Sequence, residues 1–287
     1  MNEAAFIRYL GAKKTVDDRA LNRRVWEQMI LCAAHPAPRV LELGGGIGTM
    51  VERVAADGRL GPRSWTVVDS QPALIEEAHR RLASAATAPG AVRAVPFDVE
   101  LVTSGLEEYA ASGFVPFDLV MANAFLDLFD TAQVLPVIRA LCRPSGHFLF
   151  SITFDGLTAL EPEIDAELDR RVIELYHRTM DERIVEGKPS GDSRCGRHLL
   201  TLLPRCGYRV VEAGPSDWIV HPRDGGYPAD EQFFLSCILG FFEESLSARP
   251  ELEKNELARW LKARRDQLAA GELVFIAHQV DVLAAPR

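Results

Sequence analysis

The sequence has few of the features that mark several classes of protein. It has five cysteines in 287 residues, and no two of them form a CxxC pair. An odd, scattered set of cysteines argues against a disulfide framework and a structural zinc site. No stretch approaches the roughly 18 apolar residues of a membrane span, and the N-terminus lacks a basic start followed by an apolar run. We therefore expect a cytoplasmic protein that is not embedded in a membrane.

Clusters of basic residues are also missing. Lysine and arginine total 32 against 41 aspartate and glutamate, which gives a formal net charge of -9. No segment concentrates enough positive charge to form the footprint of a nucleic-acid-binding protein. No compact group of His, Asp and Glu indicates a bound metal. We expect a small-molecule substrate and no nucleic-acid partner, and the sequence leaves a homodimer open.

The chain does show a regular alternation of strand-like and helix-like segments. A short apolar run at 39–43 ends in three glycines, as a buried parallel strand does when it enters a tight turn. Such alternation predicts a parallel sheet with right-handed crossovers. The expected strands are 39–43, 65–69, 91–95, 118–123 and 146–153, and the expected helices are 16–34, 49–56, 72–86 and 134–142.

Beyond residue 156 the pattern changes. Residues 157–197 and 221–272 are too long to be ordinary connections of about 2 to 6 residues, and both have helical periodicity. We expect these two insertions to form a helical cap. The predicted organisation is an N-terminal helical segment 1–38, a core of 39–156 and 198–220, the two insertions, and a last strand in 273–287.

The glycine loop after the first strand carries the strongest signal. Glycines at 44, 46 and 48 let a ligand approach the backbone, and the helix that follows offers unpaired N–H groups. The fingerprint of nicotinamide dinucleotide sites has glycines at its first, third and sixth positions, whereas Thr49 stands at the sixth position here. This offset, together with Glu42 ahead of the turn, makes the dinucleotide interpretation less favourable.

Polar residues end the next strands. Asp69 lies about 20 residues beyond the loop, the spacing at which a carboxylate accepts hydrogen bonds from ribose hydroxyls. Asp98 follows the expected third strand, where it can accept from an exocyclic amine such as that of adenine, while Val99 offers a backbone N–H. Asn123 ends the fourth strand at the carboxyl edge of the sheet.

This ordered set resembles the class I S-adenosylmethionine-dependent methyltransferase superfamily over residues 38–155. Residues 208–220 and 273–283 resemble the final two strands of that family. The resemblance implies an α/β, Rossmann-like, mostly parallel seven-stranded sheet with helices on both faces and an antiparallel last strand. The helical cap would be added by the two insertions.

The resemblance also implies roles for individual residues around the cofactor S-adenosylmethionine and its product S-adenosylhomocysteine. Glu42 would act near the cofactor through water or the loop backbone, Asn123 would lie beside the sulfonium, and Tyr9 would close over the cofactor. The other implied contacts are the methionine and ribose portion at Gly44, Gly46 and Gly48, the ribose hydroxyls at Asp69 with Ser70 beside it, and adenine at Asp98 and Val99.

The predicted activity is transfer of a methyl group to an O, N or C atom of a small metabolite. The first alternative is an NAD(P)-dependent oxidoreductase, because the loop and Asp69 suit both cofactors. A second alternative is a protein of the same fold that binds S-adenosylmethionine without methylating.

Residues for the acceptor are harder to select. His198 and Tyr176 are candidate catalytic residues, and both have structural alternatives. Asp127 and Asp130 follow the fourth strand, where either a base or a helix cap is expected, and the cap is favoured. The candidate substrate-binding residues are Arg194, Arg197, Trp218 and Tyr227.

Overall fold

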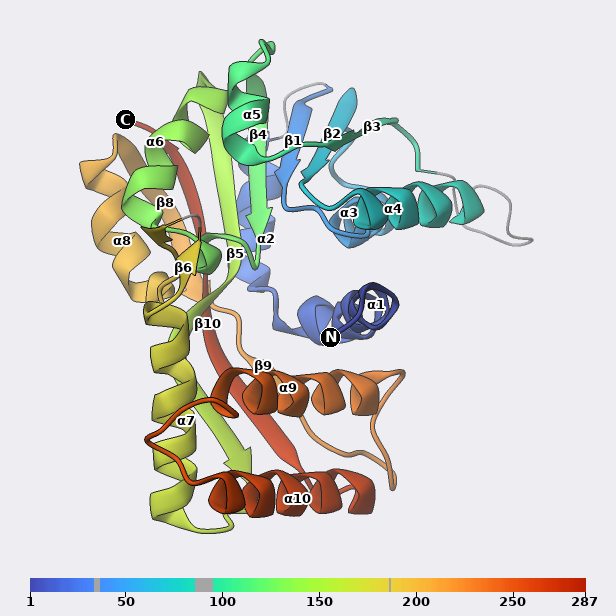
Figure 1. Cartoon of the computed structure of the whole chain (residues 1–287). Helices are drawn as coiled ribbons and strands as arrows, with labels where there is room; N and C mark the ends of the chain where they lie inside the picture. The colour runs from blue at the N-terminus through green and yellow to red at the C-terminus, as the bar shows by residue number, and fades with distance from the viewer. Residues whose placement is uncertain (34–36, 86–94, 186) are drawn as a thin grey trace.

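The computed structural model describes residues 1–33, 37–85, 95–185 and 187–287. Its upper half is a sheet covered by helices, and its lower half is a group of helices packed on two long strands that continue out of the sheet (Figure 1). The first helix lies between the two halves.

The described strands form an eight-stranded sheet in the order β3-β2-β1-β4-β5-β10-β8, with β9 paired to β10. Pairing is parallel from β3 through β5, whereas β10 is antiparallel to both β5 and β8. The predicted Rossmann-like fold class is confirmed, and the short β9 adds one strand to the seven expected. The bounds are β1 Arg39–Leu43, β2 Ser64–Asp69, β3 Asp98–Thr103, β4 Phe117–Asn123, β5 Cys142–Glu161, β8 Tyr208–Pro215, β9 Trp218–Val220 and β10 Val274–Pro286.

Helices cover both faces of the sheet because successive residues of its strands point to opposite sides. Val40 packs in the core beneath α2 and α3, while its neighbour Leu41 packs in the core beneath α5, α6 and α8. Across the described ranges, none of the helices has the length and apolar character needed to cross a membrane. These helices are α2 Arg23–Ala33, α3 Thr49–Asp57, α4 Pro72–Ala85, α5 Leu106–Ala111, α6 Thr131–Leu141 and α8 Cys195–Arg205.

The predicted helix over 16–34 is in fact two helices, α1 Glu3–Ala20 and α2. The break lies at Asn22, whose side-chain oxygen accepts from the Val25 N–H at 3.0 Å, as an N-terminal cap does. The Asn22 N–H in turn donates to the Asp281 carboxylate at 2.8 Å. Of the predicted strand 91–95, residues 91–94 lie outside the described residues, and the strand in this position of the sheet is β3.

The two insertions that we expected to form a cap are largely helical in the structure. They contain α7 Ala166–Asp181, α9 Glu231–Leu246 and α10 Lys254–Ala270, with a small hairpin of β6 Ile184–Val185 and β7 Lys188–Pro189 after α7. These helices and α1 share a hydrophobic core of their own with the outer ends of β5 and β10. Because β5 runs on to Glu161, it passes the boundary expected at residue 156 and carries the sheet into the cap.

A buried ion pair holds the cap helices together. The Arg264 side chain is 0% exposed and donates to Asp169 Oδ1 at 2.6 Å. The same oxygen accepts from Trp260 Nε1 at 2.6 Å. Asp169 therefore joins α7 to α10 at two points.

We expect Asp169→Ala to lower the free energy of unfolding by about 3 to 5 kcal/mol, because it leaves a buried guanidinium without its partner. Glu174→Ala, which removes an exposed carboxylate from the same helix, should cost less than about 0.5 kcal/mol. Urea denaturation measures both. Equal denaturation midpoints for the two variants would show that the buried pair does not stabilise the cap.

Candidate active site

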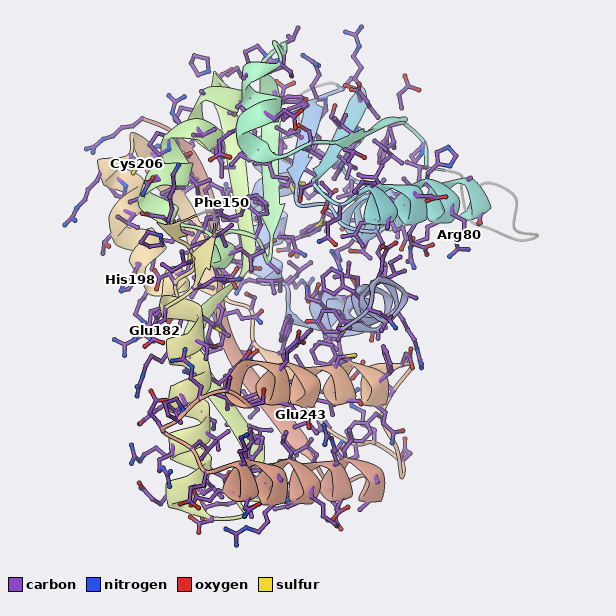
Figure 2. The ribbon with its side chains drawn as sticks, in the orientation of Figure 1. Arg80, Phe150, Glu182, His198, Cys206 and Glu243 are labelled. Atoms are coloured by element: carbon purple, nitrogen blue, oxygen red, sulfur yellow. The ribbon has the colours of Figure 1, made fainter. Side chains whose placement is uncertain are left out.

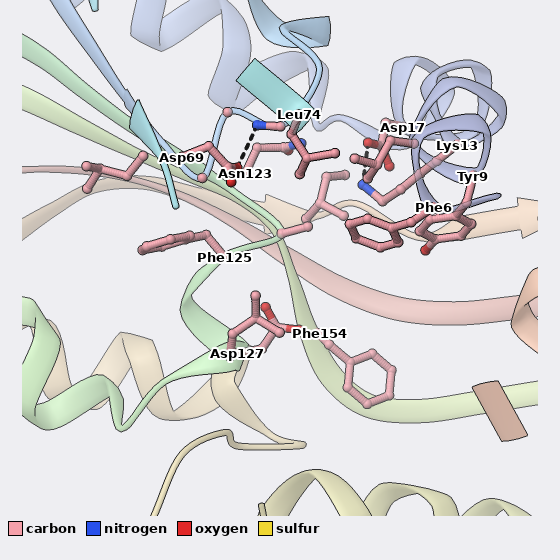
Figure 3. Close-up of a pocket in the computed structure, with 18 of the residues that line it drawn as sticks. Phe6, Tyr9, Lys13, Asp17, Asp69, Leu74, Asn123, Phe125, Asp127 and Phe154 are labelled. Carbon is pink, nitrogen blue, oxygen red and sulfur yellow. Dashed lines mark hydrogen bonds and ion pairs between the residues drawn. The ribbon is translucent and has the colours of Figure 1, made fainter. Parts of the chain in front are cut away.

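A cavity of about 560 Å³ lies between the carboxyl edge of the sheet, α1 and the cap. Its walls come from the loops after β1, β2, β3 and β4, from α1, and from the cap (Figure 3). This volume is within the range of about 300 to 1,000 Å³ for small-molecule and cofactor sites. Ligands of open α/β sheets bind at this edge.

The glycine loop forms one wall of the cavity. Gly44 has φ +63° and Gly46 has φ +54°, a left-handed backbone that side chains rarely adopt. A β-carbon at Gly44 would also collide with the ring of Phe125. The Gly46 N–H donates to Asp69 Oδ2 at 2.9 Å, so the loop is fixed to the end of β2 (Figure 3).

Asp69 is buried and lines the same wall. Its other oxygen, Oδ1, accepts from the Gln71 N–H at 2.9 Å. Burial raises the pKa of the Asp69 carboxyl, against the lowering effect of these two backbone hydrogen bonds. The carboxylate holds the loop and presents an acceptor group to the cavity.

Glu42 lies beneath the loop. It is 2% exposed, and its Oε2 accepts from Trp65 Nε1 at 3.0 Å. Burial raises the pKa of Glu42 to about 8, so the group is mostly protonated at neutral pH. A β-carbon at Gly45 would lie 3.1 Å from Glu42 Cδ, which shows how closely this side chain supports the turn.

The prediction that Asp98 and Val99 hold adenine is wrong in position. In the parallel register of β2 and β3, Asp98 pairs with Ser64 and Thr103 pairs with Asp69. Asp98 and Val99 therefore stand at the amino end of β3, about 16 Å of strand away from the cavity edge. The error follows from placing the strand seven residues early. Residues 104–107, directly after β3, line the cavity instead.

Several other predicted residues do line the cavity. Asn123 ends β4, and its Oδ1 accepts from Ser151 Oγ at 3.0 Å. Trp218 Nε1 donates to Asp17 Oδ1 at 2.9 Å, which fixes the indole against α1. Their roles in binding stay predictions. The predicted residues on the wall are Tyr9, Glu42, Gly44, Gly46, Asp69, Ser70, Asn123, Tyr176 and Trp218.

Gly48 and Tyr227 are not on the cavity wall. Gly48 has φ +79°, a left-handed backbone that side chains rarely adopt, and a β-carbon there would make an ordinary contact with Ala78 Cβ at 3.5 Å. The Tyr227 hydroxyl donates to the Leu273 carbonyl at 2.9 Å. The structure therefore does not place Gly48 at the cofactor or Tyr227 at the substrate within this cavity, in contrast to the prediction from the sequence.

The predicted candidates on α8 also lie elsewhere. His198 is exposed on the outer flank of the molecule (Figure 2), with Nδ1 2.7 Å from Asp192 Oδ2. The exposed Arg197 pairs with Asp155 at 2.9 Å, and Arg194 is exposed just before the helix. None of the three lines the cavity. The helical period of this segment did not reveal which face of α8 is turned to solvent.

Sequence reasoning missed most of the cavity wall beyond Asn123. This part is built by aromatic side chains from α1, the loop after β4, β5, α9 and β10. Lys13 and Asp17 of α1 add a buried ion pair of 2.6 Å. Their spacing of one helical turn was visible in the sequence, whereas their burial under the cap was not. The added aromatic residues are Phe6, Phe125, Phe154, Phe241, Phe242 and Phe275.

The two acids after β4 have different roles. Asp130 caps α6, since its Oδ1 accepts from the Ala132 N–H at 3.1 Å, and the favoured interpretation is confirmed for this residue. Asp127 points into the cavity instead (Figure 3). Its Oδ1 is buried and has no hydrogen-bond partner among the described residues. Burial raises the pKa of Asp127 to about 6.

The raised pKa of Glu42 predicts a pH effect on stability. Between about pH 4.5 and about pH 8 the folded chain keeps a proton on Glu42 that the unfolded chain releases, so the free energy of unfolding falls as pH rises, by at most about 1.4 kcal/mol per pH unit. Glu42→Gln should remove this slope, whereas Glu76→Gln on the exposed side of α4 should keep it. Urea denaturation without ligand across this window is the measurement; parallel curves for Glu42→Gln and the unchanged chain would contradict the assignment.

The comparisons with known proteins agree with this geometry. Residues 41–148, which span the glycine loop, Asp69 and β4, match the family model described as a methyltransferase domain. Among curated proteins there is no significant match.

Two solved structures are among those similar to the chain. A putative type II methyltransferase from Anaeromyxobacter dehalogenans is 18% identical, with 93% of this chain and 97% of that one covered and a TM-score of 0.54. A SAM-dependent methyltransferase from Thiobacillus denitrificans, solved with S-adenosyl-L-homocysteine, is 16% identical, with coverage of 100% and 99% and a TM-score of 0.49. Residues 41–148 therefore match a methyltransferase domain, and the strand order of the sheet is that of a Rossmann-like fold.

Proposed function

We propose that the chain binds S-adenosylmethionine along the glycine loop and methylates a small molecule held in the aromatic part of the same cavity. The observation that carries this proposal is the continuity of the cavity. One space joins the loop and Asp69 at the sheet edge to a wall of aromatic rings under the cap. The acceptor and the methyl donor would therefore meet beside Asn123, where β4 ends.

The residues at the sheet edge fit the cofactor. The left-handed glycines at 44 and 46 leave room for the methionine portion, and the Asp69 carboxylate suits the ribose hydroxyls. Residues 104–107 line the place that adenine would take in this family. Glu42, mostly protonated at neutral pH, would act through the loop and not as a fixed charge.

Bound S-adenosylmethionine supplies a methyl group on a sulfonium, which needs no further activation. The task of the protein is then to orient the acceptor and to exclude water. Orientation alone is worth about 7 to 11 kcal/mol in favourable intramolecular models. Tyr9 and Phe6 of α1 line the cavity opposite Phe125 (Figure 3), where their rings would help to exclude water.

An oxidoreductase remains the second candidate because the loop and Asp69 also suit a nicotinamide dinucleotide. Thr49 at the sixth position of the loop argues against it, as does the buried Glu42, which fills the space beneath the turn. Calorimetry with S-adenosylhomocysteine and with NADH separates the two, because only one of them should bind at micromolar levels.

We expect Asp69→Ala to weaken S-adenosylhomocysteine binding by about 10- to 100-fold, since it removes charged hydrogen bonds to the ligand and to the loop. Asp98→Ala should bind as the unchanged chain does, because Asp98 is exposed at the far end of β3. Titration calorimetry measures both. A loss on Asp98→Ala equal to that on Asp69→Ala, or tighter binding of NADH, would contradict the proposed cofactor site.

A further inference from the structure

The part of the cavity beyond Asn123 has a distinctive chemistry. We call it the aromatic chamber, and its walls are Tyr9, Phe125, Phe154, Tyr176, Phe242 and Phe275. Ring faces bind apolar, ring-shaped molecules and also cations. The shape and composition of the chamber therefore favour an acceptor with an apolar ring system.

The charges of the chamber do not balance. Lys13 is the one cation among the described residues of the cavity wall, and Asp17 neutralises it at 2.6 Å. Among the described residues, Asp127 has no counter-ion in contact, and its buried Oδ1 has no hydrogen-bond partner. A buried acceptor in this state is unfavourable unless something donates to it.

The carbonyl of Asp127 is held by groups outside the cavity wall, and the N–H of the same residue hydrogen-bonds its carboxyl group, which lowers the pKa of that group. The Asp127 carbonyl accepts from the Asp192 N–H at 3.2 Å and from Arg183 Nη2 at 3.3 Å. The side chain, in contrast, is turned from its short 3-10 turn Leu126–Leu128 toward the centre of the cavity (Figure 3). A carboxylate placed in this way is available to a ligand.

We propose that Asp127 selects the acceptor, which is a ring-bearing molecule that presents an O–H or N–H group to Asp127 and carries no carboxylate or phosphate. This inference rests on the proposed function. An ionised carboxylate only accepts hydrogen bonds, so it favours the binding of a hydrogen-bond donor and repels an anion. With Lys13 already paired, the chamber offers no free cation among its described residues to hold an acidic acceptor.

Asp127 also has a role in the transfer when the acceptor atom is a hydroxyl oxygen. A lone pair of that oxygen forms the bond to the methyl carbon, the bond from sulfur to carbon breaks with its electron pair left on sulfur, and the O–H proton passes to Asp127. Burial raises the pKa of Asp127 to about 6. The group is therefore ionised, and able to take the proton, above about pH 6.

The pH dependence of acceptor binding follows from the same group. Donor binding should strengthen as pH rises through about 6, because the ionised carboxylate is the stronger acceptor. Positive charge on Arg183 and Lys13 lowers the pKa of Asp127, and the negative charge of Asp192 raises it. The other titratable groups that interact with Asp127 are Tyr9 of α1, Tyr176 of α7 and Cys195 of α8.

The test uses three probes on one ring system: 2-naphthol, 2-naphthylmethylamine and 2-naphthoate. Each is titrated by calorimetry into the full chain in the presence of saturating S-adenosylhomocysteine. We expect naphthol and the amine to bind at least about 10-fold more tightly than naphthoate. The two donors distinguish a hydroxyl acceptor from an amine.

The matched variants are Asp127→Asn and Asp130→Asn. Asp127→Asn keeps the shape of the side chain and removes its charge. It should weaken binding of both donors by about 10-fold or more. It should also remove the pH dependence of donor binding and improve the binding of naphthoate. Asp130→Asn removes a carboxylate from the same loop, keeps a residue that caps helices well, and should change none of these. Binding of S-adenosylhomocysteine to each variant shows that it is folded.

The outcomes separate the two proposals. Failure of the unchanged chain to bind S-adenosylhomocysteine overturns the proposed function. Normal binding of S-adenosylhomocysteine with no binding of any probe, with naphthoate equal to naphthol, or with undiminished donor binding by Asp127→Asn overturns the role of Asp127. The pH profile of the unchanged chain needs no variant, and a flat profile through pH 6 counts against this role as well.

Discussion

The antiparallel ladder between β5 and β10 runs from Phe148 and Ala284 in the sheet to Glu161 and Val274 in the cap. Because the two strands belong to both halves, they fix how the cap stands above the carboxyl edge. Asp281 of β10 sits at the transition, where its two oxygens accept from the N–H groups of Ile152 at 2.7 Å and Asn22 at 2.8 Å. Ile152 has φ +54°, so the strand bends where the cavity begins.

That bend also positions the first helix. Asn22 starts α2 and ends the turn after α1, so the same carboxylate that fixes β5 fixes the direction from which α1 crosses the cavity. The apolar face of α1 then shares the hydrophobic core of the cap. A single buried acid thus connects the sheet, the cap and the helix that covers the site. The cavity lies between these three elements.

Three acids at this cavity have pKa values that burial raises. Glu42 and Asp127 carry values of about 8 and about 6, and burial also raises the pKa of Asp69. Such perturbed groups are common at functional sites because stability is given up there for chemistry. The two groups differ in one respect that matters, since Glu42 has a partner in Trp65 whereas Asp127 Oδ1 has none in the described chain.

Local signals predicted the sheet edge well. The run at 39–43, the loop and Asp69 all belong to the first strand–helix–strand unit, residues 39–69, so the strand, turn and helix signals agree there. The predicted position of the third strand was wrong, because an apolar run at 91–95 resembled a strand more than the alternating residues of β3, Asp98 to Thr103, did. One wrong strand then moved the adenine contacts to the wrong end of the sheet.

The acceptor side could not be predicted in the same way. Its wall combines α1, the loop after β4 and the cap helices, which meet only through long-range packing. His198 and Asp127 show the difficulty, because neither helical period nor spacing tells which polar residue faces solvent and which faces a cavity. The solvent-exposed His198 had the more suggestive neighbours in sequence, whereas Asp127, whose Oδ1 is buried, had the pattern of a helix cap.

The central claim is that one cavity brings the methyl donor and a small acceptor together. Incubation of the chain with methyl-labelled S-adenosylmethionine and a bacterial metabolite extract tests this claim most directly. The account predicts label in a small, ring-bearing molecule, in an amount that grows with enzyme concentration. Tight binding of S-adenosylhomocysteine with no label in the small-molecule fraction would contradict it.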